Sequence, residues 1–166
     1  VAALIALERD RSGGGGELFL IREWIEGRDL DSALPALTRA ATLAVLADVL
    51  RGLAALHGLG LPHGDVKPSN VIVTPAGRGV LVDPAFADPE RAQRGTLHFL
   101  APERILSAPP SEAADLWAFG ALLVFALTGE APIAGRGPLE VVRAVLGGVD
   151  LAKLAERIGD DRLAAL

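Results

Sequence analysis

The sequence predicts one domain of the α+β class, in which short strands near the N-terminus precede a mainly helical region. Two apolar runs with strand-like composition, at residues 3–8 and 18–24, flank a charged and glycine-rich turn. Apolar residues then recur at spacings of three and four across residues 38–57, which is typical of a helix with one buried face. With 166 residues, 51% of them hydrophobic, the chain is long enough to bury a substantial core.

The composition argues against several kinds of site and partner. The chain has no cysteine, which rules out disulfides, a thiolate nucleophile and a cysteine-bound zinc, and fits a reducing compartment. Its three histidines are scattered, and a net charge of −5 without a basic run argues against nucleic acid as a partner. The apolar runs at residues 1–7 and 116–127 are shorter than the roughly 20 residues that cross a bilayer. We therefore predict no membrane segment in this chain, and a cytoplasmic protein or the cytoplasmic part of a larger one.

Two hairpins are predicted. The first joins the two N-terminal runs through four consecutive glycines at residues 13–16. A phosphate-binding loop is the alternative there, but no Gly-Lys-[Ser/Thr] follows and no helix begins, so a flexible turn is favoured. In the second hairpin, residues 71–73 pair with residues 80–82 across a turn rich in proline and glycine.

The helix at residues 38–57 is expected to end at Gly58 and Gly60. Its predicted buried stripe consists of Leu43, Leu46, Val49, Leu50, Leu53 and Leu56. His57 lies on the same stripe, and we interpret it as a packed residue at the helix end rather than a chemical group.

Three further helices follow in the C-terminal half. Ser111 is a suitable N-cap and Gly129 a suitable C′ residue for a helix at residues 112–128, which is apolar nearly all round and is expected to be buried. Pro138 begins a helix that continues to residue 146, and Asp150 caps another that continues to residue 158.

The octapeptide at residues 63–70 follows the first long helix and gathers three chemically useful groups. Asp65 can accept a proton from a hydroxyl, Lys67 can neutralise phosphate, and Asn70 can offer its side-chain oxygen to a hard cation. Pro68 stiffens the loop and biases Lys67 towards an extended backbone. These groups suit phosphoryl transfer, while the alternative is a polar turn between a helix and a hairpin.

Asp83 stands at the end of the second hairpin and can supply another oxygen ligand. A hard cation such as Mg²⁺ would then take Asn70 and Asp83 from the protein, with water and phosphate oxygens completing its octahedron.

Three motifs together resemble the eukaryotic-type (Hanks-type) serine/threonine protein kinases. The octapeptide is similar to His-Arg-Asp-x-Lys-Pro-x-Asn, with Gly64 in place of the arginine. Residues 95–103 are similar to Gly-Thr-x-x-[Tyr/Phe]-x-Ala-Pro-Glu, and residues 115–120 to Asp-x-Trp-x-x-Gly. The resemblance implies a protein-kinase-like α+β fold with a mainly helical C-lobe.

By this resemblance the whole chain, residues 1–166, is one partial kinase domain. Residues 1–25 are the last N-lobe strands, residues 26–30 the hinge and residues 31–166 the C-lobe. The family's glycine-rich loop, strand lysine and its glutamate partner are not found in the sequence, and the chain has no methionine. We therefore expect an excised piece of a longer protein, with little or no activity in isolation.

The resemblance also implies the ligands: ATP, Mg²⁺ and a protein with a Ser or Thr hydroxyl. Asp65 would deprotonate that hydroxyl, Lys67 would stabilise the γ-phosphoryl group, and Asn70 and Asp83 would hold Mg²⁺. Around the adenine and ribose, the resemblance places the Glu23 carbonyl, the Ile25 backbone N–H and the Asp29 side chain.

Further residues have supporting roles in the family. Thr96 matches the substrate-site threonine that contacts the catalytic Asp and Lys, and Asp115 matches the Asp that hydrogen-bonds the backbone of the catalytic loop. Glu103 matches a glutamate that pairs with an arginine from the final segment of the lobe. That segment is not evident in the sequence, so Glu103 would lack its partner unless Arg157 or Arg162 supplies it.

Three positions depart from the family pattern. Gly64 replaces the arginine that would bind an activation-loop phosphate, and the segment from Asp83 to Glu103 has no hydroxyl other than Thr96. The resemblance therefore implies a non-RD kinase that is not regulated by phosphorylation of this loop. Arg22 occupies the position behind the adenine, which is usually apolar or small, and Pro84-Ala85 replace Phe-Gly after Asp83.

Two other functions remain open from the sequence. A pseudokinase-like binding or scaffold module is suggested by Arg22 and by the residues after Asp83. A small-molecule phosphotransferase of the aminoglycoside-kinase type is suggested by His-Gly-Asp, although that family lacks the Ala-Pro-Glu and Asp-x-Trp-x-x-Gly segments.

Overall fold

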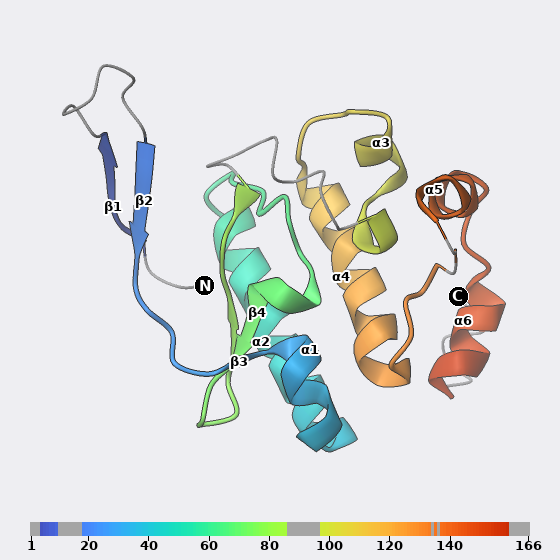
Figure 1. Cartoon of the computed structure of the whole chain (residues 1–166), viewed down its shortest axis with the longest axis horizontal. Coiled ribbons are helices and arrows are strands. Elements are labelled where there is room, and N and C mark those ends of the chain that lie inside the picture. The colour runs from blue at the N-terminus through green and yellow to red at the C-terminus, as the bar shows by residue number, and fades with distance from the viewer. Residues whose placement is uncertain (1–3, 10–17, 86–96, 134, 136, 160–166) are drawn as a thin grey trace.

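A computed structural model describes residues 4–9, 18–85, 97–133, 135 and 137–159. Within these ranges the chain has the predicted α+β fold, with two small antiparallel sheets and a larger helical part. Figure 1 shows the first sheet standing apart, a second sheet in front of α2, α4 beside them, and α5 and α6 at the far end.

The first sheet is the predicted N-terminal hairpin. Strand β1 (Leu4–Arg9) pairs antiparallel with β2 (Leu18–Arg22), with an irregularity between Leu4 and Ala6. The second strand ends two residues earlier than predicted, and residues 23–27 form an extended connection to the rest of the molecule (Figure 1).

The second sheet has the order β3-β4-β5. The predicted hairpin is present as β4 (Val71–Val73) and β5 (Gly79–Leu81), and β3 (Arg28–Asp29) adds a strand that the sequence did not predict. Gly27 allows the chain to lie close to β4, because its φ is +151° and a Cβ atom there would lie 2.4 Å from the Val73 carbonyl oxygen. The connecting segment is thereby held directly against the hairpin that leads to Asp83.

The main core lies between the second sheet, α2 (Arg39–His57) and α4 (Glu112–Thr128). Thr38 caps α2, since its hydroxyl accepts a hydrogen bond from the backbone N–H of Ala41 at 3.2 Å. The predicted stripe is only partly correct: Leu43 and Leu50 are 45% and 40% exposed. The other four predicted residues are buried, together with Val45, which the prediction omitted.

Two features of α2 bear on its place in the fold. Among the described residues, it alone has the length and mean hydropathy that a membrane-spanning helix would need, but it is the helix at the centre of this core. Its Asp48 accepts hydrogen bonds from Arg78 Nε at 2.8 Å and from the Gly79 N–H at 3.1 Å, and it pairs with Arg51. Burial opposes ionisation of Asp48, but these contacts hold the pKa of its carboxyl below the usual value. The carboxylate thus joins α2 to the β4–β5 turn.

The long helix α4 has the predicted bounds and caps. The Ser111 hydroxyl accepts from the Ala114 N–H at 3.1 Å, and Gly129 ends the helix with a φ of +74°. Burial is less complete than predicted, because Leu116 is 54% exposed and Gly120 lies at the surface. Of its buried residues, Ala118 and Leu122 belong to the main core, and Asp115 contacts the backbone of residues 63 and 64.

The C-terminal part forms a second, smaller apolar cluster around Ile133, Val141 and Val145. It includes α5 (Pro138–Leu146) and lies against the 3₁₀ turn η5 (Leu97–Phe99) and α3 (Pro102–Ile105). The last helix, α6 (Leu151–Ile158), begins after Asp150, whose carboxylate accepts from the Lys153 N–H at 3.1 Å as predicted. Two shorter elements, α1 (Leu30–Ala33) and η1 (Leu34–Ala36), were not predicted.

Candidate active site

Asp115 of α4 binds the backbone of the loop at residues 63–70. One carboxylate oxygen accepts the backbone N–H of His63 at 2.6 Å, and the other accepts that of Gly64 at 2.7 Å. Asp115 is 1% exposed, so its charge is stabilised by these hydrogen bonds and not by water. The contact between Asp115 and the loop backbone, which the resemblance implied, is present.

His57 also binds Asp115, and the sequence did not predict this contact. Its Nε2 lies 2.9 Å from the same carboxylate oxygen that accepts the His63 N–H, and its side chain is 14% exposed. The prediction of a packed residue at the helix end is correct as far as burial is concerned. The ring of His57 nevertheless makes a polar contact, because it orients the Asp115 carboxylate that binds the loop.

His63 is fully buried and makes two hydrogen bonds through its ring. Nε2 lies 3.0 Å from the Val82 carbonyl oxygen, which can only accept, and Nδ1 accepts the Asp65 N–H at 3.3 Å. Both bonds together require a neutral ring with its proton on Nε2. Burial lowers the pKa of His63 from its usual value, although the nearby carboxylates of Asp115, Asp65 and Asp83 oppose that shift.

The three polar side chains of the loop meet at Asp65. Lys67 Nζ lies 2.6 Å from Asp65 Oδ2, and Asn70 Nδ2 donates to the same oxygen at 2.9 Å and to the Asp65 backbone carbonyl at 2.8 Å. Lys67 is extended, with φ −162° and ψ 165°, and the 3₁₀ turn η2 (Pro68–Asn70) begins directly after it. The backbone bias that Pro68 imposes is thus present.

Backbone hydrogen bonds on either side of Asp83 attach it to the loop at residues 63–70. The Val82 N–H donates to the Asn70 carbonyl at 2.9 Å, and the Ala85 N–H donates to the His63 carbonyl at 2.7 Å. Asp83 has a φ of +56°, an unusual value for a residue with a Cβ atom, and such conformations cost on the order of 1 kcal/mol and cluster at functional sites. The carboxylate therefore lies beside the loop at a position that the surrounding structure maintains.

Asn70 and Asp83 have the chemistry that a hard divalent cation needs. Because Nδ2 of Asn70 donates to Asp65, the amide oxygen is the atom left for another ligand, and Asp83 adds carboxylate oxygens on a side chain that is 57% exposed. This oxygen donor set fits Mg²⁺, with the remaining positions supplied by water or phosphate.

Arg22 contacts this site from the end of β2. Its Nε lies 2.9 Å from Asp83 Oδ1, and its Nη1 donates to the Glu23 carbonyl at 3.2 Å. The sequence indicated that Arg22 was unusual at this position, but its partner is 61 residues away and was not predicted.

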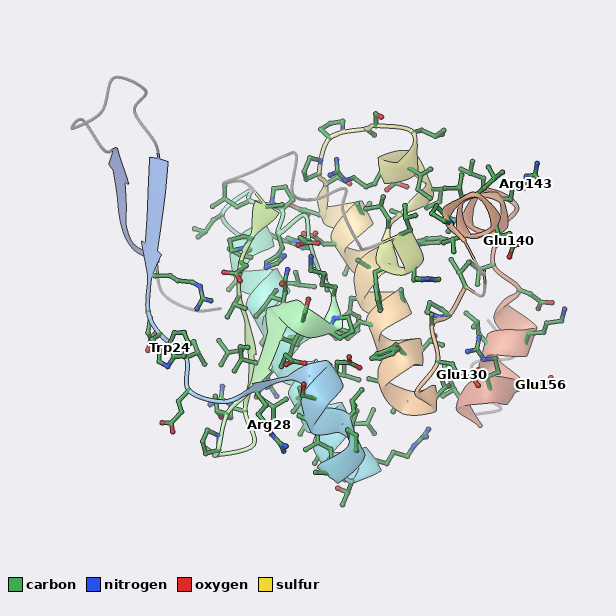
Figure 2. The ribbon with its side chains drawn as sticks, viewed as in Figure 1. Trp24, Arg28, Glu130, Glu140, Arg143 and Glu156 are labelled. Atoms are coloured by element: carbon green, nitrogen blue, oxygen red, sulfur yellow. The ribbon has the colours of Figure 1, made fainter. Side chains whose placement is uncertain are left out.

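The predicted nucleotide residues lie between β2 and α1. Glu23 and Ile25 are in the connecting segment, where Trp24 is 83% exposed and its ring stands beside the chain (Figure 2). Asp29 caps α1: its two carboxylate oxygens accept from the N–H and the hydroxyl of Ser32, both at 2.9 Å. The Ser32 N–H is the main cause that holds the pKa of Asp29 below its usual value. In this structure Asp29 is thus engaged within its own turn.

Of the two arginines that could have paired with Glu103, one has another partner and the other lies outside the described residues. Arg157 does not pair with Glu103; its Nη2 lies 3.2 Å from Glu130 Oε2, and the guanidinium also donates to the carbonyls of Ala131 and Pro132. Glu103 lies in α3, and Arg157 is bound instead to the segment that follows α4, at residues 130–132. Thr96 and Arg162 lie outside the described residues.

Comparisons with known proteins show the family of this chain. The family described as protein kinase domain matches residues 7–157. The chain therefore belongs to the protein kinase family.

Several similar proteins are serine/threonine-protein kinases by name. PkaB of Streptomyces coelicolor is 37% identical over 154 residues, and the match covers 81% of this chain and 37% of that protein. PknA of Mycobacterium tuberculosis is 32% identical over 145 residues, and the match covers 81% of this chain and 34% of PknA. PknL of the same organism is 33% identical over 150 residues, and the match covers 84% of this chain and 37% of PknL. The chain thus spans about a third of the length of these relatives.

Proposed function

We propose that this chain carries the catalytic loop of a serine/threonine protein kinase, which transfers the γ-phosphoryl group of ATP to a Ser or Thr hydroxyl. The observation that carries the proposal is the convergence of Lys67 Nζ and Asn70 Nδ2 on one oxygen of Asp65. Two donors fix the orientation of a carboxylate whose task would be to receive a proton in the transition state.

In the proposed reaction Asp65 accepts the proton of the substrate hydroxyl while that oxygen forms its bond to the γ-phosphorus. The bond from the γ-phosphorus to the bridging oxygen breaks, and ADP leaves with the electron pair. The ammonium of Lys67, which has three N–H donors, can contact a γ-phosphoryl oxygen as well as Asp65. Mg²⁺ held by Asn70 and Asp83 would neutralise charge on the phosphates.

The hinge assignments remain part of the proposal. The Glu23 carbonyl and the Ile25 N–H would bind the adenine edge. For Asp29 to bind the ribose, its carboxylate would exchange a hydrogen bond to Ser32 for one to the ribose hydroxyl. Thr96 would help to align the substrate hydroxyl with Asp65 and Lys67.

We also propose that the enzyme is of the non-RD type and is not regulated by phosphorylation of the segment after Asp83. Gly64 supports this proposal beyond its lack of a side chain. Its φ is +78°, and a Cβ atom there would lie 3.1 Å from the Ala85 Cβ and 3.2 Å from the Pro110 Cβ. The space beside the loop backbone is therefore filled by neighbours that leave little room for an arginine.

The test uses the native full-length product that contains this chain. We expect transfer of labelled phosphate from Mg·ATP to Ser and Thr peptides, but not to a Tyr peptide or to an aminoglycoside, and we expect Asp65→Asn to slow it about 10²- to 10⁴-fold. Asp31→Asn removes an exposed carboxylate of α1 and serves as the matched control. Preferential phosphorylation of the aminoglycoside would contradict the assigned substrate class.

A binding module without transfer is the second candidate, and the contact of Arg22 with Asp83 favours it. Such a module would bind nucleotide with no phosphate transfer in the wild-type protein, and Asp65→Asn would then have no effect on its function.

A further inference from the structure

The ion pair between Arg22 and Asp83 joins two residues with conflicting tasks. Asp83 is the carboxylate proposed to hold a divalent cation, yet its Oδ1 already lies 2.9 Å from the guanidinium Nε of Arg22. The pair connects the end of β2 in the N-terminal hairpin to the loop after β5. It therefore places a positive charge at the carboxylate that the metal would need.

The guanidinium cannot leave Asp83 by losing its proton. An arginine side chain stays charged at any physiological pH, and all of its polar hydrogens are donors. Arg22 is also tethered locally, because Nη1 donates to the carbonyl of the adjacent residue, Glu23. Asp83 is consequently released by a competing cation or by displacement of the end of β2.

The exposure of the pair allows such an exchange. The side chain of Asp83 is 57% exposed and that of Arg22 is 27% exposed, so solvent and ions reach the carboxylate. Ion pairs of this exposure are worth little, because water and salt screen them. The pair can thus weaken the binding of a divalent cation to Asp83 without preventing it.

We propose that Arg22 is an internal counter-ion for Asp83, which a divalent cation must displace before Asp83 can act as a metal ligand. This inference rests on the proposed function, since it assigns Asp83 to the metal. It makes Arg22 a residue that sets the concentration of divalent cation at which the site is filled. Arg22, the unusual residue behind the predicted adenine position, then affects the binding of the metal through its side chain.

The test measures binding of Mn²⁺ to the 166-residue chain by the loss of the electron paramagnetic resonance signal of free Mn²⁺. We expect Arg22→Met to tighten the dissociation constant about two- to fivefold, the range that an exposed ion pair supplies. Arg22→Lys, which keeps the charge without the guanidinium, should give a smaller change. Arg28→Met removes the same charge from β3, beyond the connecting segment (Figure 2), and should leave the constant unchanged.

Nuclear magnetic resonance of the arginine Nε–H groups supplies a second measurement without any activity. The Arg22 signal, identified by its absence in Arg22→Met, should shift when Mg²⁺ is added to the wild-type chain and should not respond in Asp83→Asn. Equal Mn²⁺ affinity in the wild type and Arg22→Met, with binding lost in Asp83→Asn, would overturn the exchange and leave the metal assignment intact. Binding that is unaffected by Asp83→Asn, or absent from both the wild type and Arg22→Met, would overturn the exchange together with the metal assignment.

Discussion

Asp115 is expected to be the most costly single side chain to remove from the site. Asp115→Ala leaves the backbone N–H groups of His63 and Gly64 buried without their acceptor, and it also removes the partner of His57 Nε2. An unsatisfied buried donor costs about 1–3 kcal/mol, and loss of one partner from a buried charged network costs about 3–5 kcal/mol. We therefore expect the free energy of unfolding to fall by about 3–5 kcal/mol.

The assay for Asp115 is urea unfolding of the chain, followed by circular dichroism. Asp115→Asn has nearly the same shape, but its amide NH₂ would face a backbone N–H. The free energy of unfolding should therefore fall nearly as much in Asp115→Asn as in Asp115→Ala. Glu112→Ala removes an exposed carboxylate from the first turn of the same helix and should cost less than about 1 kcal/mol. If Asp115→Ala were no less stable than Glu112→Ala, the claim that this carboxylate holds the loop would be refuted.

Two further predictions concern the same loop. Burial lowers the pKa of His63, so as the pH drops below 6.5 the unfolded chain takes up a proton that the folded chain does not. The contribution of His63 to the free energy of unfolding should therefore be full above pH 6.5 and fall below it. A nuclear magnetic resonance titration that shows His63 protonated at or above pH 6.5 would contradict this. Gly64→Ala should lower the free energy of unfolding by more than the roughly 1–2 kcal/mol expected from its positive φ alone. Gly60→Ala has a similar φ of +70° but nothing within 4 Å, and an equal loss in both variants would show that Ala85 and Pro110 do not restrict the space beside Gly64.

The parts of the fold that the sequence predicted well depend on local signals. The bounds of α4 follow from Ser111 and Gly129, those of α5 from Pro138, and the start of α6 from Asp150. Each of these residues acts on backbone groups within one turn of itself. The strand β3 and helix α1 were missed because they have two and four residues, too few to show a periodic pattern.

Side-chain partners that are distant in the sequence were harder to predict. The order of residues in the loop was sufficient to select Asp65, Lys67 and Asn70, which the structure brings into contact. The partners of Arg22 and His57 are 61 and 58 residues away, and the composition around them gives no signal for that pairing. The exposure of Leu43 and Leu50 likewise depends on which neighbours cover α2, and spacing alone does not specify that.

The central claim is that Asp65 receives the proton during phosphoryl transfer. Its most direct test compares the rate of phosphate transfer to a Ser or Thr peptide between the wild-type full-length product and Asp65→Asn, at saturating Mg·ATP. A positioned general base contributes about 10²- to 10⁴-fold, so we expect the rate to fall by that factor while the free energy of unfolding changes little. An Asp65→Asn protein that transfers phosphate at the wild-type rate would contradict the account.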